Sequence, residues 1–481
     1  MTDLLETFRR VKVNSVMLDY RYRRDALYHL NLAYAAMLLK QGFMTRVEHD
    51  TIVDGLKKVQ ARISEEDIRK CDGDIYFLYE SELFKTIDKN VAAKLHIGRS
   101  RNDMYFTMYR MSLRDAIWQV IDEIIETQKL LEQQVKLHAE TVIPYYTYGQ
   151  PAQPGTWGHY LLSVHEMFAA DLERLQHAYK TVNKSAMGSA AGIGTAFKLD
   201  KKTVADLLGF DDVIENTVIG NSAVDYFLET ISDLGILNTT LSRVSSDMIF
   251  FASAECKILD CDRRICGVSS IMPQKKNAAA VELLRSQTEH FNGYMVNAFS
   301  SASSTTLFPV HETYFFFERF WDNVHILIDN VRLLRLILEL STVNKERGYR
   351  LALDGFTAAT GMAEELTVET GEPFTLTHHV VGGMIRTLMD QHRLSIENMT
   401  PEMLKDQSQK VLGKTIERTQ QQIGAMLDPL ASLNAKVTGG TPKPTDTLNM
   451  LNEAIRIRAR NEEWLKASKS KVGHAYSHLE R

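Results

Sequence analysis

The segment from Gly267 to Asn277, GVSSIMPQKKN, holds the densest group of chemically useful side chains in the sequence. Hydroxyl, ammonium and amide groups follow one another there, with a glycine at the start and a proline in the middle. Polar groups on every face fit neither an amphipathic helix nor a buried strand, and glycine and proline indicate a loop. The run AAAVELLRSQ that follows favours a helix, whose N-terminal dipole would add to the positive field of Lys275. The segment therefore predicts either a loop that carries a base and binds an anion, or a solvated basic loop.

A second polar segment, KLHIGRSRND, spans Lys94 to Asp103 and ends where a long helical pattern begins. Guanidinium, hydroxyl and amide donors follow one another in it, from Arg99, Ser100, Arg101 and Asn102. Arginine binds carboxylates in a bidentate geometry, and the helix dipole helps to hold an anion. The segment predicts an anion site, with a capping loop held by structural ion pairs as the alternative.

A third polar segment, PYYTYGQPAQPGTW, runs from Pro144 to Trp157 and also leads into a long helical pattern. Its prolines and glycines predict a rigid turn. The turn carries Thr147, Tyr148, Gln150 and Gln153. The small-residue loop SAMGSAAGIGTAF, residues 185–197, would let backbone amides approach a ligand closely. Its glycines are weak evidence for a nucleotide site, because no strand precedes them.

Two further groups of residues have ordinary structural interpretations. His311, Glu312 and Tyr314 lie at the start of a helical pattern, where a lone histidine is more often a cap or surface residue than a catalyst. Cysteines recur every five residues at Cys256, Cys261 and Cys266. Zinc sites usually use CxxC pairs with a fourth ligand nearby, which this spacing lacks. We therefore expect neither a metal nor a cofactor.

Composition excludes several classes of protein. A net charge of −5 over 481 residues gives no polybasic surface for nucleic acid or a membrane. No apolar run approaches the roughly 18 residues of a transmembrane helix. The start, MTDLLETFRR, lacks the apolar core of a signal peptide, and four cysteines are too few for a disulfide scaffold. We expect a cytoplasmic globular protein.

Helical periodicity dominates the elements that must position these segments. Segments such as HDTIVDGLKKVQARI repeat apolar residues at three- and four-residue spacing, and alternating strand patterns are few. Prolines are absent between Pro154 and Pro273 and between Pro309 and Pro373, which permits long helices. We expect long helices at about 104–140, 156–183, 223–256, 277–302 and 314–343. We therefore expect an all-α protein with an extended bundle.

The helix lengths also suggest a division into three parts. Shorter helices in residues 1–105 predict an N-terminal helical domain, and the long helices of residues 106–357 predict the central bundle. Helices shorten again in residues 358–481, which predicts a C-terminal helical domain. Long bundle helices expose broad apolar faces, so we expect oligomerisation through the central part.

Three of these segments, taken together and in this order, resemble the three signature regions of the fumarase/aspartase superfamily. They are HIGRSRND, the YT–Q–AQP turn and SSIMPQKKN. The likeness is greatest to the argininosuccinate lyase family. QGFMTRVEHDTIVDGLKKV is similar to that family's N-terminal domain, and GSAAGIGTAF, LLGFDDVIEN and VELLRSQ extend the likeness to about residue 290.

The resemblance implies a three-domain all-α homotetramer with a twenty-helix core, in which each active site combines signature regions from three subunits. It also implies an anti-elimination that releases fumarate and an amine. A base removes a Cβ proton from a succinyl group, and the Cα–N bond then breaks.

The resemblance implies catalytic and binding roles for the residues of this sequence that match the family's motifs. Ser269 would be the base, acting as an alkoxide in the positive field of Lys275. Lys275 and Asn277 would stabilise the dianionic aci-carboxylate, each by roughly 3 kcal/mol if it behaves like an oxyanion-hole donor. Gly267 would let the loop close. The other carboxylate would be held by Ser100, Asn102 and Thr147. The full set expected to bind substrate is Arg99, Ser100, Arg101, Asn102, Thr147, Gln150, Ser270, Met272, Asn277, His311 and Tyr314.

The chain departs from the family pattern on the amine side. The family's YTHxQ histidine, associated with the acid, is Tyr148 here, although Glu282 fits the glutamate that pairs with it. A tyrosine with a pKa near 10 cannot shuttle a proton at neutral pH as histidine does. The family's SDRD reads SAVD at residues 222–225, without the arginine. The Tyr, Gln and Lys near the family's AYNxDxQEDK motif fall, by ungapped alignment, on Thr306, His311 and Tyr314.

The residues at the family's succinate-binding positions are retained, whereas those at its amine-binding positions differ. We therefore expect a substrate other than argininosuccinate. The sequence predicts a C–N lyase that cleaves an N-substituted aspartate, possible models being the ethylenediaminedisuccinate, hydrazinosuccinate and nitrosuccinate lyases. Catalysis would involve Ser269, Lys275, Glu282 and Tyr148. Two alternatives stay open: argininosuccinate lyase itself, and a catalytically silent structural homotetramer. The expected partners are a small-molecule substrate and other copies of the chain.

Overall fold

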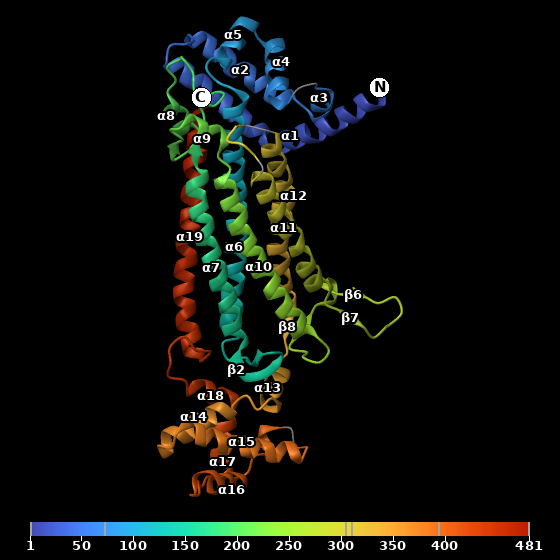
Figure 1. The fold of residues 1–481 in the computed structure, drawn as a ribbon, viewed down its shortest axis with the longest axis vertical. Coiled ribbons are helices and arrows are strands. Elements are labelled where there is room, and N and C mark those ends of the chain that lie inside the picture. Colours follow the sequence, from blue (N-terminus) through green and yellow to red (C-terminus); the bar gives the residue numbers. More distant parts are fainter. Residues whose placement is uncertain (1, 72–73, 304, 309–310, 393–394, 480–481) are drawn as a thin grey trace.

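The computed structural model describes residues 2–71, 74–303, 305–308, 311–392 and 395–479. These residues form a long helical bundle with a smaller helical unit at each end (Figure 1). The described strands form only short two-stranded pairs. The expectation of an all-α fold with a long central bundle is therefore confirmed.

Within the described residues, six long helices run along the bundle. They are α6 (Arg101–Leu137), α7 (Trp157–Val182), α10 (Asp225–Ala252), α11 (Ala279–Ser303), α12 (His311–Glu339) and α19 (Pro444–Leu479). The first five agree with the five sequence-based ranges to within about four residues at each end. Helix α6 contacts α7, α12, α19 and α1, and it is buried on nearly every side, as expected of a central helix.

The N-terminal unit caps one end of the bundle. Its helices are α1 (Thr2–Lys40), α2 (Arg46–Arg62), α3 (Glu65–Lys70), α4 (Ile75–Thr86), α5 (Lys89–Ala93) and the 3₁₀ turn η1 (Lys94–His96). Two short helices lie beside it, α8 (Lys201–Leu207) and α9 (Thr217–Ser222). This unit shares one continuous apolar core with the bundle, so its position relative to the long helices is fixed by packing.

The C-terminal unit has an apolar core of its own at the other end. Its helices are α13 (Lys345–Asp354), α14 (Ala359–Thr370), α15 (Phe374–Asp390), η3 (Ile396–Asn398), α16 (Pro401–Leu412), α17 (Gln420–Leu427) and α18 (Pro429–Asn434). Helix α19 does not stay with this unit. It returns along the bundle and packs on α6 and α7, so the segment 358–481 contains a bundle helix as well as a small unit.

In the part of the chain that the structure describes, four short strand pairs join the helices. Antiparallel pairs are β1 (Val142–Thr147) with β2 (Gln150–Thr156), β5 (Leu259–Cys261) with β8 (Ser341–Val343), and β6 (Gly267–Val268) with β7 (Lys276–Asn277). The parallel pair is β3 (Lys184–Ser185) with β4 (Asp212–Val213). The 3₁₀ turn η2 (Arg263–Ile265) connects β5 to β6.

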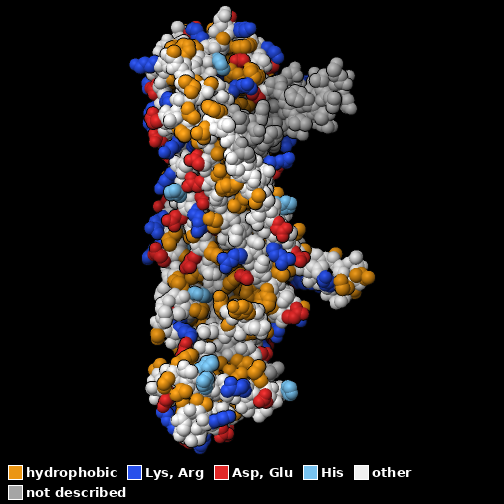
Figure 2. All heavy atoms as spheres, viewed as in Figure 1, with side chains coloured by type: hydrophobic (Ala, Val, Ile, Leu, Met, Phe, Trp, Pro, Cys, Tyr) orange, Lys and Arg blue, Asp and Glu red, His pale blue; other side chains and the backbone are white. Residues whose placement is uncertain are grey.

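Charged and hydrophobic side chains are interspersed on the face of the bundle in view, and one described segment projects from its side (Figure 2). This projection is the hairpin of β6 and β7, and hydrophobic side chains cover its tip. In the parts of the chain that the structure describes, no helix combines the length and the apolar character needed to cross a membrane.

Candidate active site

The hairpin of β6 and β7 carries the SSIMPQKKN segment. Gly267 pairs with Asn277 and Val268 pairs with Lys276, so the residues between them form a closed loop on a two-stranded base. A Cβ atom placed on Gly267 would lie 3.3 Å from the side chain of Ala279, which is a tight contact at this base. The backbone between the two strands is irregular, as the glycine and proline of this segment predict. Helix α11 begins two residues after the end of β7.

The hydroxyl of Ser269 lies at the start of this loop. Its Oγ accepts hydrogen bonds from the backbone N–H of Met272 at 3.0 Å and of Ile271 at 3.4 Å. Two amide dipoles therefore point at the oxygen, and they stabilise negative charge there more than they stabilise a neutral hydroxyl. Ser269 is half-buried, so the two amides act where water only partly screens them.

The other side chains of the loop face solvent. Ser270, Met272 and Lys275 are exposed, and Asn277 is half-buried on β7. Glu282 is exposed in the first turn of α11, with a carboxylate oxygen 3.9 Å from Arg285. The loop thus brings Ser269, Lys275 and Asn277 together on one projection, although no described group of this chain closes over them.

The hairpin of β1 and β2 carries the YTYGQ turn. Thr147 pairs with Gln150, so Tyr148 and Gly149 form a two-residue tip, with φ angles of +54° and +72°. Positive φ at both central residues is typical of a type I′ turn, which favours asparagine and glycine. A tyrosine in the left-handed region costs about 1–2 kcal/mol. The Tyr148 side chain is completely exposed at the tip, and Thr147 and Gln150 are exposed beside it.

The HIGRSRND segment ends as the N-terminal cap of α6. Ser100 is the cap residue, its Oγ accepts from the backbone N–H of Asn102 at 3.3 Å, and Asp103 completes a capping box. Ser100 and Asn102 are half-buried at this end of the helix. Arg101 is exposed, and its guanidinium donates to the Asp74 carboxylate at 2.5 Å.

Asp103 is an important residue that the sequence interpretation missed. Its Oδ1 accepts from the backbone N–H of Ser100 at 2.9 Å, and its Oδ2 accepts from Gly188 at 3.1 Å and Ala190 at 2.9 Å. The carboxylate is fully buried, and this burial raises its pKa to about 6. Asp103 therefore ties the cap of α6 to the small-residue loop 185–197. The spacing S-x-x-D was a visible signal for its capping role alone.

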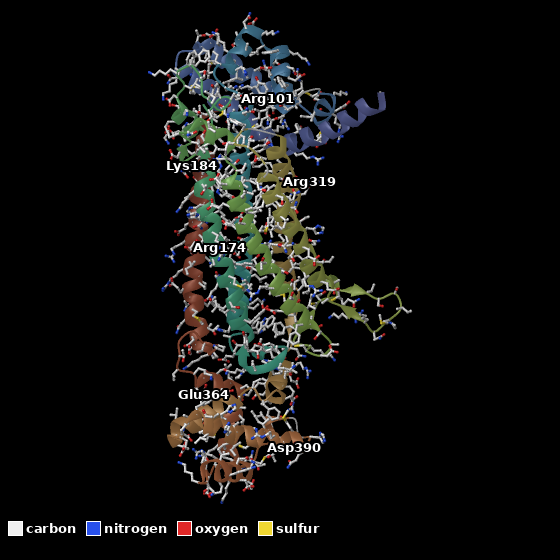
Figure 3. The ribbon with its side chains drawn as sticks, viewed as in Figure 1. Arg101, Arg174, Lys184, Arg319, Glu364 and Asp390 are labelled. Carbon is white, nitrogen blue, oxygen red and sulfur yellow. The ribbon has the colours of Figure 1, made fainter. Side chains whose placement is uncertain are left out.

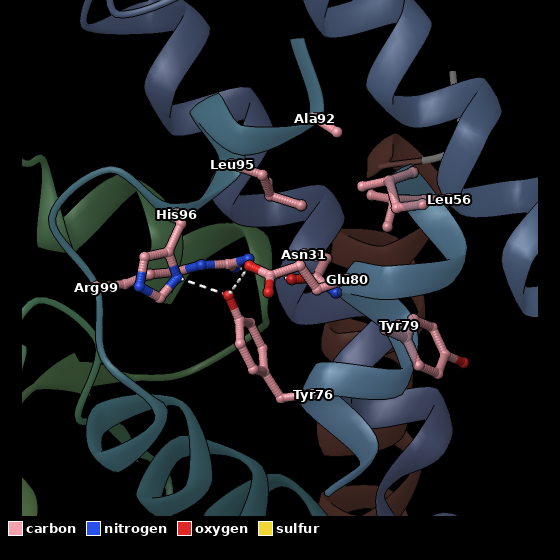
Figure 4. Close-up of a pocket in the computed structure, with 10 residues that line it drawn as sticks. Asn31, Leu56, Tyr76, Tyr79, Glu80, Ala92, Leu95, His96 and Arg99 are labelled. Atoms are coloured by element: carbon pink, nitrogen blue, oxygen red, sulfur yellow. Dashed lines mark hydrogen bonds between the residues drawn. The ribbon is translucent and has the colours of Figure 1, made fainter. Parts of the chain in front are cut away.

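Arg99 turns away from the cap and into the N-terminal unit (Figure 4). Its guanidinium is buried, donates to Asn31 Oδ1 at 2.7 Å and lies over the Tyr34 ring at 5.1 Å. It lines a small cavity with His96 and Tyr76, whose hydroxyl lies 2.7 Å from His96 Nδ1. Burial, followed by the nearby guanidinium, lowers the pKa of His96. Its hydrogen bond to Asn31 directs the guanidinium into the N-terminal unit, and the expectation that Arg99 binds substrate stays a prediction.

The three signature regions do not meet within one chain. Arg101 lies at the N-terminal end of the bundle, while the β1–β2 and β6–β7 hairpins lie toward the opposite end (Figure 3). Side chains of His311 and Tyr314 lie outside the described residues, although their backbone begins α12. Within the described ranges, no group of three or more His, Cys, Asp or Glu residues has the arrangement of a metal site.

Sequence comparison finds relatives along most of the chain. The profile of a family described as Lyase matches residues 9–292. The argininosuccinate lyase of Methanocaldococcus jannaschii is 33% identical over 417 residues, covering 86% of this chain and 84% of that protein. The argininosuccinate lyase of Methanococcus aeolicus is 32% identical over 426 residues, covering 88% of this chain and 85% of that protein.

Solved structures with the same fold include EDDS lyase in complex with formate. It has a TM-score of 0.87 at 26% identity and covers 97% of this chain and 91% of its own. An EDDS lyase variant with bound fumarate gives the same values. The 3-carboxy-cis,cis-muconate lactonizing enzyme from Pseudomonas putida shares the fold at a TM-score of 0.73 and 19% identity, covering 90% of this chain and 95% of its own.

Proposed function

Because the chain belongs to this lyase family, in the argininosuccinate lyase-like part of the fumarase/aspartase superfamily, we propose that it is a carbon–nitrogen lyase. It cleaves an N-substituted aspartate to fumarate and an amine, by a reversible anti-elimination. The observation that carries the proposal is the Ser269 hydroxyl, which receives two backbone N–H groups on a loop that also presents Lys275.

In the first step, Ser269 removes the Cβ proton of the succinyl group. A serine hydroxyl is a weak acid, so its alkoxide needs local positive potential. The amides of Ile271 and Met272 supply two dipoles directed at Oγ. The ammonium of Lys275 adds a full charge on the same loop, and closure over substrate would strengthen both effects by excluding water.

Proton removal converts the adjacent carboxylate into a dianionic aci-carboxylate. Lys275 and Asn277 stabilise this charge, each by roughly 3 kcal/mol if it acts as an oxyanion-hole donor. The electron pair then forms the Cα–Cβ double bond of fumarate as the Cα–N bond breaks, and the nitrogen keeps the bonding pair. A nitrogen that is already an ammonium leaves as a neutral amine and needs no proton from the protein.

The second carboxylate of the succinyl group binds at Ser100, Asn102 and Thr147. Ser100 and Asn102 lie at the positive end of the α6 dipole, which favours an anion. Arg99 belongs to this proposed binding set, and its buried guanidinium also anchors the segment that precedes Ser100. Arg101, Gln150, Ser270 and Met272 belong to the same proposed set.

The complete site requires more than one copy of the chain. Ser100 and Ser269 are carried at different ends of a bundle whose helices are rigid, so one chain cannot bring them to one substrate. Exposed apolar side chains along the bundle support a shared interface. They include Ile236, Leu283, Val296, Phe299 and Leu336. We propose a homotetramer whose sites combine three subunits, with an N-terminal domain, a central bundle that includes α19, and a C-terminal domain.

The amine half of the substrate differs from arginine in this proposal. Tyr148 replaces the histidine of the family pattern, and residues 222–225 lack its arginine. The likeness to EDDS lyase suggests an aminopolycarboxylate or a related N-alkyl aspartate. Argininosuccinate is the second candidate, favoured by the argininosuccinate lyases among the relatives at 30% identity and above. A catalytically silent role is the third.

The test is the reverse reaction. Purified protein is incubated with fumarate and a panel of amines (arginine, ethylenediamine, amino acids, hydrazine and ammonia), fumarate is followed by its ultraviolet absorbance, and products are identified by mass. The matched control is the Ser269→Ala variant in the same panel. Consumption with one amine class, absent from the variant, supports the proposal and identifies the substrate half. Consumption with arginine alone would support argininosuccinate lyase, and no consumption with any amine would favour the silent role.

A further inference from the structure

The last turns of α19 carry two histidines that none of the proposed catalytic segments uses. His474 and His478 lie four residues apart on one face of the helix, and both side chains are exposed. The Nε2 atoms of the two rings are 3.0 Å apart, the length of a hydrogen bond between the two imidazoles, so a metal ion bound by both nitrogens would displace the proton between them. The ring centroids are 4.5 Å apart, and the ring planes are nearly perpendicular at 88°.

We propose that His474 and His478 form a chelating site for one divalent transition-metal ion, with water as the remaining ligands. Two imidazoles at i and i+4 of a helix are a known arrangement for holding one metal ion. With metal–nitrogen bonds of about 2.0–2.1 Å, Nε2 atoms 3.0 Å apart subtend roughly 94° at the metal. That angle is close to the 90° between neighbouring ligands of a square-planar or octahedral ion.

The general affinity order of divalent ions ranks the metals for a site with two nitrogen ligands. Cu²⁺ and Ni²⁺ take tetragonal or square-planar nitrogen ligands, and copper stands highest in the general affinity order. The site therefore favours Cu²⁺, then Ni²⁺, over Zn²⁺.

The helix holds the pair in place from its opposite side. Tyr476, between the two histidines in sequence, stacks its ring on His29 at a centroid distance of 3.9 Å. Its hydroxyl accepts a hydrogen bond from Arg114 Nη2 at 2.9 Å. These contacts join the last turns of α19 to α1 and α6, so the backbone that carries the two imidazoles is already fixed before a metal binds. The negative C-terminal end of the helix dipole also favours a cation there.

We expect the metal ion at this site to exchange with solution and to have no catalytic role. Two protein ligands bind a metal less tightly than the three or four of catalytic and structural sites. The described residues contain no larger His, Cys, Asp and Glu cluster that would complete it. A second histidine pair, His378 and His379 on α15, provides a matched comparison. Those residues are adjacent, and their ring centroids are 6.0 Å apart, so they lack the chelating geometry.

The experiment titrates the untagged full-length protein with Cu²⁺, Ni²⁺ and Zn²⁺ by isothermal calorimetry, after chelator treatment and dialysis. The variants are His474→Ala, His478→Ala and the control double variant His378→Ala with His379→Ala. Alanine is a strong helix former and the two positions on α19 are exposed, so folding is preserved. Circular dichroism checks this directly.

We expect one Cu²⁺ per chain in a distinct strong phase, with weaker Ni²⁺ and weaker Zn²⁺ binding. Either single alanine should weaken this phase about tenfold or more, because one imidazole then replaces a chelating pair. The control should bind like the unaltered protein. Unchanged affinity in His478→Ala, loss of the phase in the control, or tighter Zn²⁺ than Cu²⁺ binding would overturn the proposal.

Discussion

Asp260 Oδ1 lies 2.6 Å from Lys276 Nζ, so a carboxylate on β5 holds a side chain on β7, at the base of the Ser269 loop. Strand β5 is fixed to the bundle through its pairing with β8. The carboxylate raises the pKa of Lys276 by this hydrogen bond, so the ammonium keeps its charge throughout the neutral range. The projecting loop is therefore attached to the rigid body by an ion pair in addition to its own strands.

Removing that ion pair should impair the positioning of the loop. We expect Asp260→Asn to lower kcat/KM about two- to fivefold, the range set by a partly exposed pair. Asp262→Asn is the control, because Asp262 pairs with Arg264 inside its own turn at 2.9 Å. The double variant Asp260→Lys with Lys276→Asp exchanges the two charges and should recover part of the lost kcat/KM. An equal loss in both single variants would show that the pair has no special role.

Ser269→Ala should abolish most of the activity while leaving the assembly intact. Loss of a base that acts in the transition state costs about 10²–10⁴-fold in kcat. The measurements are turnover, and oligomeric state by light scattering. Ser246→Ala, which alters an exposed serine on α10, serves as the control. Substantial residual turnover in Ser269→Ala would remove the base assignment.

Replacing Tyr148 should separate stability from activity. The Asn-Gly pair is the preferred tip of a two-residue hairpin, so Tyr148→Asn should raise the free energy of unfolding by up to about 1 kcal/mol. Activity should fall if the phenol contacts substrate. Thermal melting and turnover are measured on the same samples. Tyr145→Asn, within β1, should not stabilise the protein, and full activity in Tyr148→Asn would mean that the phenol is dispensable.

Asp103 should make stability depend on pH in the acid range. Its folded-state pKa of about 6 is raised above the usual value of 3.8 for this carboxyl, so the folded state binds the proton more tightly. This group therefore adds stability as pH falls from about 6 to about 4, and its contribution is lost as pH rises through 6. Asp103→Asn cannot titrate. The free energy of unfolding of the variant minus that of the unaltered protein should therefore be more negative at pH 4.5 than at pH 7. Denaturant unfolding at the two pH values measures this difference.

Much of the fold was predictable because it depends on local patterns. The five long helices follow from apolar periodicity and proline-free stretches, both readable within one helix. The roles of Arg99 and Asp103 were not predictable in the same way. Arg99 is buried because Asn31, 68 positions earlier, accepts its hydrogen bond, and Asp103 accepts from the backbone of Gly188, 85 positions later. Such partners depend on the folded arrangement and leave no local signal.

The return of α19 to the bundle has a consequence for how the protein is made. Helix α6 ends at Leu137 and α19 begins at Pro444, so the ribosome adds about 300 residues between these neighbours. At ordinary rates of synthesis this takes roughly 15–60 s, during which the face of α6 and α7 that α19 covers stays exposed. The nascent chain must keep this apolar face from aggregating until the last helix emerges. Premature termination before Pro444 should therefore give an insoluble product, although every loop proposed for catalysis would already have been translated.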